Sequence, residues 1–499
     1  MSIKLTNVQG NILGGFNKDF QDFAFVKVKD ATKARKWVRD NSEELISSSK
    51  QVLAFNNAFK ALLAEGVSRP ESSIAARWAN IAFSFKGLQA LNFSNAELGN
   101  LPAAFTAGMA ARNIGDVAAS APQHWDAPFD PAHLPDIHAV LLIAADTAPD
   151  LALHVATVTA SADFLAGFQV VGTVNGRTRV DNRGHEHFGF KDGVSQPGIR
   201  GINSPDDPLA NPDQGHPGQD LLWPGEFVLG HPTQKPMAKP GHDGPNPDKG
   251  LVSTAGNAAW TQDGSFLVFR RLEQDVPKFH KQLGEIAAAN NLSVDVMGAK
   301  LVGRYKSGCP LPALSMQPSP APISATDPAL ANPALADSDA LNNAFEFGDD
   351  PLGARCPLGA HIRKVYPRDE DNGHGPVDSE SETQTHRLLR RGIPFGNSFG
   401  AAVGGGPADK RGLCFLAYQN DIEKHFEFVQ KNWVNLAAFP PVAGQPAHVA
   451  GDDPIIAQSA NGPFELTPGG PNIAVSHFVK TTGGEYFFAP SLETLTTRF

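Results

Sequence analysis

Short apolar runs recur along the first half of the chain, and segments with helical patterns separate them. Each run is strand-like because it is brief and rich in β-branched and aromatic residues, whereas the intervening segments place apolar residues at helical spacing. This order predicts a β-α-β-β-α-β unit with its helices on one face of an antiparallel sheet. The predicted strands are residues 23–28, 78–85, 137–145 and 168–173, and the predicted helices lie around residues 34–38 and 149–164.

The second half of the chain carries a similar set of patterns. Three short apolar runs predict strands, and two segments with helical spacing predict helices. Two such units predict an α+β protein with a crevice between or beside its sheets. The runs are residues 266–269, 412–418 and 486–488, and the helical segments are residues 276–289 and 421–433.

Two long segments between these elements predict loops. Residues 203–248 are dense in Pro, Gly, Asp and His, and residues 317–337 are rich in Pro and Ala. Long loops in compact enzymes often line or cover a site, although solvated surface decoration explains such segments equally well.

Charge and cysteine content limit the partners of this chain. Its 42 basic and 52 acidic residues give a net charge of −10, which argues against nucleic acid or an anionic membrane as the main partner. The three cysteines are too few for a disulfide framework or a Cys-rich metal site. No apolar run approaches the ~20 residues of a membrane span. The N-terminal residues show no apolar h-region and no twin-arginine signal, so an intracellular (cytoplasmic) protein is expected, with export by another route as the alternative.

Asp192 stands in the segment FGFKDGVSQP, residues 188–197. Glycines on either side of an acidic residue allow the backbone to approach a ligand closely, so Asp192 is a candidate for a carboxylate that faces a ligand. Asp-Gly is also a common turn pair, and a purely structural turn is the alternative interpretation.

His361 stands in CPLGAHIRKVYPR, residues 356–368, in an apolar and basic setting. Cations beside a possible metal ligand are useful if the cofactor carries carboxylates. A third segment, HRLLRRGIPFG at residues 386–396, has three arginines within five residues. One of them turned inward would place a fixed positive charge in a pocket, whereas a solvated face is the alternative.

Taken together and in order, these segments resemble the motifs of the dye-decolorizing peroxidase family. FGFKDGVSQP is similar to the family's G-x-x-D-G signature, CPLGAHIRKVYPR to its proximal-histidine segment, and LLRRGIPFG to its distal-arginine segment. The chain looks most like the longer forms of fungi and some bacteria. Further agreeing stretches span nearly the whole chain: NVQGNILGGF (7–16), NIAFSFKGLQAL (80–91), FLVFRRLEQDV (266–276), VGRYKSGCPL (302–311), GLCFLAYQND (412–421) and GGEYFFAPSL (483–492).

The resemblance implies two ferredoxin-like domains and a haem b cofactor. Residues 1–225 would form the N-terminal domain with the distal Asp loop, and residues 226–499 the haem-binding C-terminal domain. Because the chain has no C-x-x-C-H motif, covalent c-type attachment of the haem is excluded.

The resemblance also implies the roles of individual residues. His361 is similar to the axial ligand of the haem iron, with an acidic partner at Asp452 or Asp453. Asp192 resembles the distal acid–base residue, and Arg390 resembles the arginine that stabilises charge on the departing oxygen, with Arg391 as the adjacent alternative. The product of that step would be a ferryl iron with a second oxidising equivalent. The remaining cofactor-binding candidates are Leu413 and Phe415, an apolar distal wall, and Arg363, a partner for a haem propionate.

The resemblance and the sequence give weaker indications of function at Phe395, Trp433 and the triplet His185–His187. Family members often have Tyr where this chain has Phe395, and Phe is too hard to oxidise to serve there as a radical relay. Trp433 resembles another proposed relay site that oxidises bulky substrates at the surface, although an aromatic that fills helix–sheet packing is the alternative. The triplet His185–His187 is interpreted as loop residues, because residues two apart on a strand point in opposite directions and rarely chelate one ion.

The sequence is compatible with three functions. The resemblance implies an enzyme that uses hydrogen peroxide to oxidise dyes, phenols or similar reductants. The alternative within haem biology is a protein for iron release or storage with incidental peroxidase activity, but simple binding needs neither Asp192 nor Arg390. The third is a non-haem hydrolase or binding module, since fold alone does not determine function.

Overall fold

The computed structural model describes most of the 499 residues. Asp192 and the Pro- and Ala-rich segment 317–337 both lie outside the described residues, as do parts of segment 203–248. The described ranges are 3–66, 75–191, 193–209, 212–236, 248–255, 259–312, 342–370, 379–400, 405–442, 444–445, 447–458 and 462–499.

The first half of the chain forms four antiparallel strands in the order β4-β1-β3-β2. All four overlap the apolar runs that predicted them, and β3 is buried at every position. The bounds are β1 (Phe20–Val28), β2 (Arg77–Phe83), β3 (Ala139–Ala145) and β4 (Phe168–Arg177).

The second half repeats this arrangement. Its strands follow the order β15-β9-β12, and the outer edge of β12 pairs with β10 and β11, which are two pieces of one interrupted strand. The two halves therefore have the same topology. Strands β9, β10/β11, β12 and β15 of the second half correspond to β1, β2, β3 and β4 of the first half, and they lie in the same spatial order. The bounds are β9 (Ser265–Gln274), β10 (Leu389–Arg390), β11 (Ile393–Phe395), β12 (Gly412–Gln419) and β15 (Val479–Ala489).

Two edge pairings join the halves into one closed ring of strands. Phe488 of β15 pairs with Phe83 of β2, and Phe395 of β11 pairs with Gly176 of β4. Closure satisfies edges that would otherwise expose unpaired backbone groups. The prediction of an α+β protein with two antiparallel units is confirmed. Within the described residues, the sheets are joined at both edges, so a crevice between them is absent and the alternative of a crevice beside them remains. The domain boundary at residues 225 and 226 stays a prediction.

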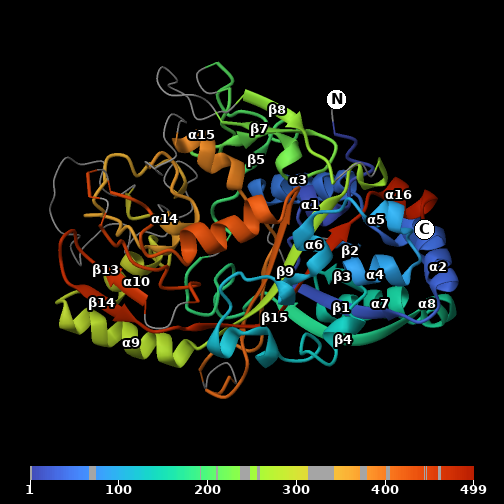
Figure 1. Cartoon of the computed structure of the whole chain (residues 1–499), viewed down its shortest axis with the longest axis horizontal. Helices are drawn as coiled ribbons and strands as arrows, with labels where there is room; N and C mark the ends of the chain where they lie inside the picture. Colours follow the sequence, from blue (N-terminus) through green and yellow to red (C-terminus); the bar gives the residue numbers. More distant parts are fainter. Residues whose placement is uncertain are drawn as a thin grey trace.

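Helices cover the outside of the ring, as Figure 1 shows, with the N-terminal helices at one end of the molecule and α9 and α10 at the other. Local capping explains where several helices begin: Asp30 accepts a hydrogen bond from the backbone of Lys33 at α2, and Asp275 from that of Lys278 at α9. The longer helices are α2 (Ala31–Leu45), α3 (Ser49–Ala64), α7 (Ala148–Thr159), α9 (Val276–Ala289) and α10 (Val294–Val302).

Shorter elements complete the structure. The predicted helix at 421–433 is present, but it is a π-helix in two stretches, η11 (Glu423–Glu427) and η12 (Val429–Val434). Such wide turns are frequent at functional sites. The other short helices and strands are α1 (Gly10–Leu13), α4 (Phe85–Ala90), α5 (Asn95–Leu98), α6 (Ala103–Ala107), α8 (Ala162–Gly167), α14 (His361–Val365), α15 (Ser379–Thr383), α16 (Leu492–Thr497), β5 (Gly198–Ile199), β6 (Leu221–Leu222), β7 (Pro232–Lys235), β8 (Asp248–Val252), β13 (Gly462–Glu465) and β14 (Asn472–Val475).

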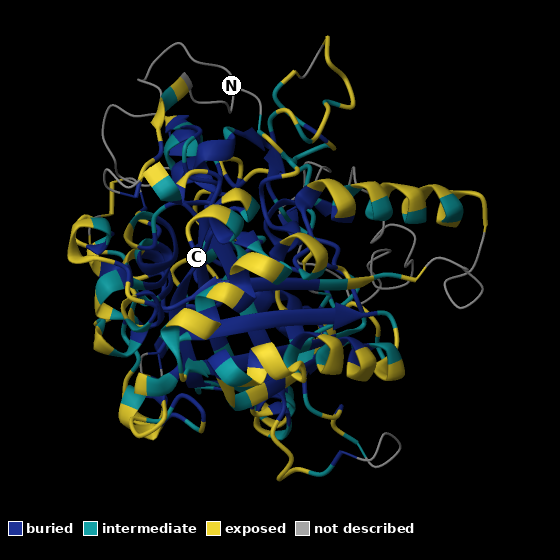
Figure 2. Cartoon of the chain, turned by 90° about the vertical axis from the view of Figure 1, so that its right-hand side faces the viewer, coloured by how far each residue is buried: buried dark blue, intermediate teal, exposed yellow. Residues whose placement is uncertain are grey.

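Phenylalanine rings from both halves fill the ring of strands. Phe25 packs edge-on against Phe269 with ring centroids 5.2 Å apart, and Phe129 stacks on Phe269 at 5.6 Å. The strands are therefore dark in Figure 2, whereas the outer faces of the helices are exposed. This shared core holds the two halves in one orientation.

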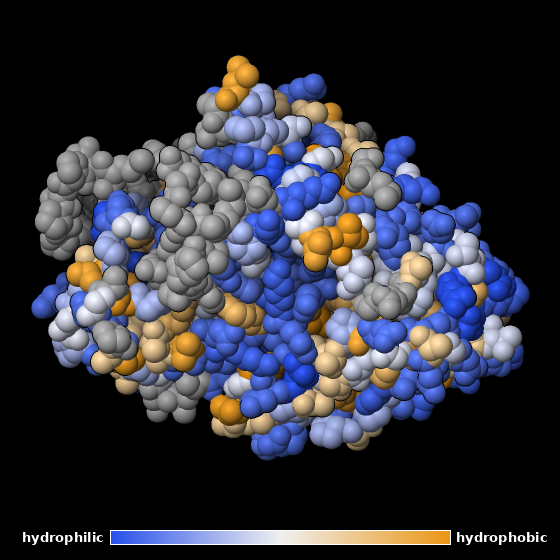
Figure 3. Space-filling view, turned by 45° about the horizontal axis from the view of Figure 1, so that its top comes forward, coloured by the Kyte–Doolittle hydropathy of each residue, from blue (hydrophilic) through white to orange (hydrophobic). Residues whose placement is uncertain are grey.

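The surface drawn in Figure 3 is mostly hydrophilic, and its apolar side chains lie in separate patches. Among the residues that the structure describes, no helix is both long and apolar enough to cross a lipid bilayer.

Candidate active site

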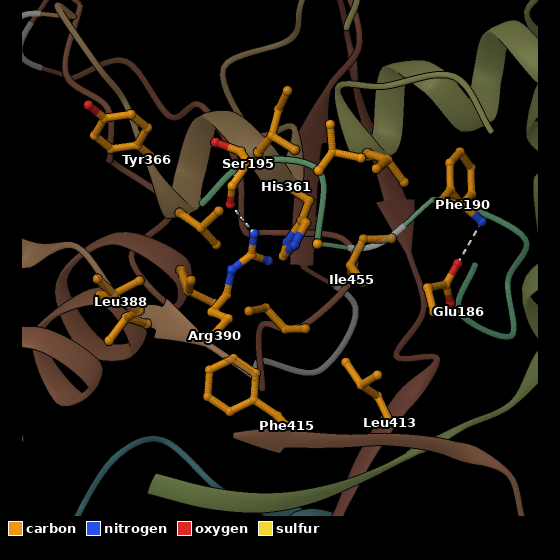
Figure 4. A pocket seen from close by; sticks show the side chains of 18 of the residues that line it. Glu186, Phe190, Ser195, His361, Tyr366, Leu388, Arg390, Leu413, Phe415 and Ile455 are labelled. Carbon is orange, nitrogen blue, oxygen red and sulfur yellow. Dashed lines mark hydrogen bonds between the residues drawn. The ribbon is translucent and has the colours of Figure 1, made fainter. Parts of the chain in front are cut away.

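A large cavity lies beside the second half of the strand ring. Its empty volume is about 1600 Å³, with the open mouth included. The lining comes from strands β9, β12 and β15, helix α14, the π-helix and the segments at residues 186–197 and 386–390 (Figure 4).

His361 is the first residue of α14 and lines this cavity. Its Nδ1 lies 2.7 Å from Oδ2 of Asp453, whose side chain is fully buried. The other oxygen of Asp453 accepts hydrogen bonds from the backbone N–H groups of Ile455 and Ile456. A carboxylate held in this way fixes the tautomer with a proton on Nδ1, so the unprotonated Nε2 is available as a ligand.

The structure distinguishes the two acidic candidates for the partner of His361. Asp453 makes the contact, whereas Asp452 lies against the backbone of Gly462. No sequence pattern separates neighbouring aspartates, because only the local backbone decides which one faces the histidine.

The family resemblance implies that His361 ligates haem iron. On that basis we expect Asp453→Asn to lower haem affinity about 10–100-fold, the usual effect of removing a carboxylate that orients a metal-bound histidine. The adjacent Asp452→Asn is the matched control and should leave haem affinity close to that of the wild type. Titration of apoprotein with haem, followed by absorption, measures both. Equal affinities of the two variants would contradict this assignment.

The side chains of Arg390 and Arg391 contact different parts of the protein. Arg390 lines the cavity, and its Nη2 donates to the backbone oxygen of Ser195 at 2.6 Å (Figure 4). Arg391 instead donates to the backbone oxygens of Asn11, Ile12 and Leu13 at the end of α1. The hydrogen bonds of Arg391 to these carbonyls satisfy groups that a helix end leaves unpaired. Of the two adjacent arginines, Arg390 is therefore the one that faces the candidate site.

The prediction that Arg363 binds a carboxylate of the cofactor is corrected by the structure. Its side chain is fully buried and forms ion pairs with Glu370 and Asp350. The same guanidinium also donates to the backbone oxygens of Cys356 and Asp350. Because its donors are used by the protein, and because it does not line the cavity, Arg363 acts as a structural cation.

We expect Arg363→Met to lower the free energy of unfolding by about 3–5 kcal/mol, because it leaves two carboxylates buried without their cation. The control is Lys281→Met, which removes an exposed ion pair with Glu285 and should change stability by less than about 1 kcal/mol. Urea unfolding of both variants measures the difference, and equal stabilities would be inconsistent with a structural role of Arg363.

Arg304 also lines the cavity, although its sequence motif indicated no role for it. Its guanidinium donates to the backbone oxygens of Gly308 and Asn342. Burial, together with the neighbouring charges of Arg368 and Arg390, lowers the pKa of Arg304 to about 9. These three arginines line one cavity, so an anionic group there would be stabilised. The motif VGRYKSGCPL contained this residue, but only the fold shows that it lies beside the other two arginines.

Leu413 and Phe415 are neighbours on one face of β12, and both line the cavity, as the alternation of a strand requires. Figure 4 shows them below Arg390. The apolar wall continues through Leu388, Phe426 and Val429. Asp192 lies outside the described residues, but its neighbours Lys191 and Gly193 both line the cavity.

Trp433 is only 1% exposed, which contradicts its predicted role as a site of oxidation at the surface. Its ring stacks on Phe439 with centroids 5.4 Å apart and packs edge-on against His386 and Phe428. These contacts support the alternative interpretation, in which Trp433 is a buried aromatic side chain of the packed interior. Phe395 is also buried, and the guanidinium of Arg271 lies 4.7 Å from the centre of its ring.

The histidines of the triplet His185–His187 contact different groups. His185 hydrogen bonds with the backbone oxygens of Arg183 and Lys306, whereas His187 hydrogen bonds with that of Phe395. Burial lowers the pKa of His187 to about 4, which keeps this ring neutral. Within the described part of the chain, no group of three or more His, Cys, Asp or Glu side chains could hold a metal ion.

Comparison with protein families gives two matches. Residues 7–180 match the DyP dimeric alpha+beta barrel domain, and residues 338–439 match the C-terminal domain of Dyp-type peroxidases. The chain is 31% identical to dye-decolorizing peroxidase msp1 of Mycetinis scorodonius, over 99% of this chain and 87% of that protein. It is also 31% identical to a multifunctional dye peroxidase of Amycolatopsis, over 98% and 94% of the two chains.

Comparison with solved structures also finds dye-decolorizing peroxidases. An ancestral D-type dye-decolorizing peroxidase superposes with a TM-score of 0.77 and 31% identity, over 100% of this chain and 99% of the other. A dye-decolorizing peroxidase in complex with 2,6-dimethoxyphenol superposes with a TM-score of 0.73 and 31% identity, over 99% of both chains. Since similarity in sequence and in structure extends over the whole length, this chain belongs to the dye-decolorizing peroxidase family and is a peroxidase.

Proposed function

We propose that the cavity binds haem b with His361 as the axial ligand, and that the enzyme uses hydrogen peroxide to oxidise phenols and dyes. The observation that carries this proposal is the pair of His361 and buried Asp453, which directs a ring nitrogen toward a cavity lined by apolar side chains and arginines. Haem, when bound, supplies the redox centre at which the O–O bond of peroxide is cleaved.

The residues of the cavity fit this cofactor. Arg304 and Arg368 are buried cations in the wall, and haem carries two carboxylates that such cations bind well. Leu413, Phe415 and Phe426 form an apolar wall suited to a porphyrin face. The propionate partners that we propose are therefore Arg304 and Arg368 in place of Arg363.

Peroxide cleavage needs a proton to move and a negative charge to be stabilised. Asp192 takes the proton from one peroxide oxygen and returns it to the other, which leaves as water. The guanidinium of Arg390 stabilises the negative charge that develops on the leaving oxygen. These roles follow from the family motifs and are supported by the position of Arg390 in the cavity wall.

A carboxylate base predicts that the reaction with peroxide stays fast well into the acid side of neutrality. The ordinary pKa of Asp is about 3.9, compared with about 6.5 for His, so Asp192 acts as a base at pH values where histidine is already protonated. The rate constant of the reaction with peroxide, measured by stopped flow from pH 3 to 8, checks this expectation. A rate constant that already falls as the pH drops below about 6.5, as a histidine base would give, would contradict it.

A second cavity adjoins the site, and we propose it as the route for peroxide and small reductants. It shares Gly193, Arg390, Leu413 and Phe415 with the first cavity. Its lining also includes Phe16, Phe55 and Phe59, whose rings suit aromatic molecules. The structure of a related peroxidase has been solved in complex with 2,6-dimethoxyphenol, and this supports the proposal that phenols are reductants of this enzyme.

Absorption spectroscopy of haem-reconstituted protein tests the proposal. We expect a Soret band that shifts after one equivalent of peroxide and returns when a phenol is added. No uptake of haem would overturn the cofactor assignment. A Soret band that does not respond to peroxide would instead favour a haem-binding protein for iron release or storage.

A further inference from the structure

Tyr366 is a buried tyrosine in the wall of the same cavity. It directly follows α14, five positions after His361, and Figure 4 shows its ring at the edge of the site with the hydroxyl directed away from Arg390. The hydroxyl donates to Oδ2 of Asp220 at 2.7 Å. Asp220 belongs to segment 203–248, so this segment supplies a group directly behind the cavity wall.

The surroundings of Tyr366 restrict how it can be oxidised. Burial, and next the charge of Asp220, raise the pKa of Tyr366 well above its ordinary value, so the phenol is protonated at rest. The guanidinium of Arg387 lies 3.8 Å from the centre of the ring, and that of Arg368 lies 5.2 Å from it. These cations oppose a positive charge on the ring, so removal of an electron must be accompanied by loss of the phenolic proton.

Asp220 is placed to take that proton. It is 2% exposed, and the oxygen that accepts from Tyr366 also accepts from Nη1 of Arg387 at 2.8 Å. The hydrogen bond of 2.7 Å allows direct transfer from the phenol to the carboxylate. Arg387 holds the carboxylate in place by its ion pair.

No other tyrosine of the chain combines these features. The chain has four tyrosines, and Tyr366 is the one that lines the cavity. Tyr486 is a useful comparison, because its hydroxyl also donates to a carboxylate, that of Glu427 at 3.1 Å, but its ring does not line the cavity. Phe395 cannot substitute, because its ring lacks the hydroxyl.

We propose that Tyr366 stores one of the two oxidising equivalents that peroxide leaves in the enzyme. With haem bound and peroxide as the oxidant, Tyr366 would give up one electron and pass its phenolic proton to Asp220, and it would become a neutral tyrosyl radical. One electron from the reductant, with return of the proton from Asp220, restores the phenol. This inference rests on the proposed haem peroxidase function.

Freeze-quench electron paramagnetic resonance of the haem-reconstituted enzyme, after one equivalent of peroxide, tests this inference. In the wild type we expect an organic radical whose spectrum narrows when the protein contains ring-deuterated tyrosine. Tyr366→Phe should remove this signal, and Asp220→Asn should reduce it at least tenfold. Tyr486→Phe is the matched control and should retain it.

The two proposals fail in distinguishable ways. Loss of the haem band, or of its response to peroxide in the wild type, would overturn the proposed function itself. If the band and its response are intact but deuterated tyrosine does not narrow the radical signal, only the role of Tyr366 is overturned. This isotope measurement uses the wild type, so it stands even if a variant fails to fold. An unchanged tyrosyl signal in folded Tyr366→Phe would also overturn the inference.

Discussion

His361→Ala is expected to abolish stoichiometric haem binding, with loss of the Soret band of the reconstituted protein. Removal of the ligand should weaken haem affinity by more than the ~10–100-fold expected for its orienting carboxylate. It also leaves the fully buried Asp453 without its partner. Absorption spectra of wild type and variant, before and after one equivalent of peroxide, measure the effect.

A matched control separates loss of the ligand from general damage. His448 also pairs with a carboxylate, that of Glu465 at 2.8 Å, but does not line the cavity. His448→Ala should therefore retain the Soret band. Added imidazole should restore part of the band in His361→Ala by occupying the vacated space. Identical spectra of His361→Ala and the wild type would show that His361 is not the ligand.

Arg390→Leu is expected to lower kcat/KM for peroxide about 10²–10³-fold, the usual cost of removing a donor that stabilises a developing oxyanion. The Soret band should persist, because Arg390 does not ligate the iron in this proposal. Stopped-flow measurement of the reaction with peroxide isolates this step from oxidation of the reductant.

Arg390→Lys distinguishes charge from geometry. Lysine keeps the positive charge but loses the planar fork of the guanidinium, so part of the rate should return. A peroxide reaction in Arg390→Leu as fast as in the wild type would remove Arg390 from the mechanism. Arg391 is not a suitable comparison, because it hydrogen bonds to backbone oxygens at the end of α1.

Most strands and the main helices could be predicted from sequence because their signals are local. The alternation and length of apolar runs identified β1, β3, β9 and β12, and α9 has the predicted bounds 276–289. Closure of the ring could not be predicted in this way. Pairing between β2 and β15, or between β4 and β11, depends on twist and packing over the whole chain.

The sequence by itself determined the chemical types at the site: a histidine, arginines and apolar side chains in ordered motifs, and with them the family. Only the tertiary structure decided which side chains meet there. It placed Asp453 instead of Asp452 against His361, 92 residues away along the chain. It buried Arg363 in ion pairs and Trp433 among aromatic rings, and it brought Arg304 and Tyr366 to the cavity. The physical reason is that periodicity reports the face on which a residue lies, whereas the partner of a buried polar group depends on how distant segments pack.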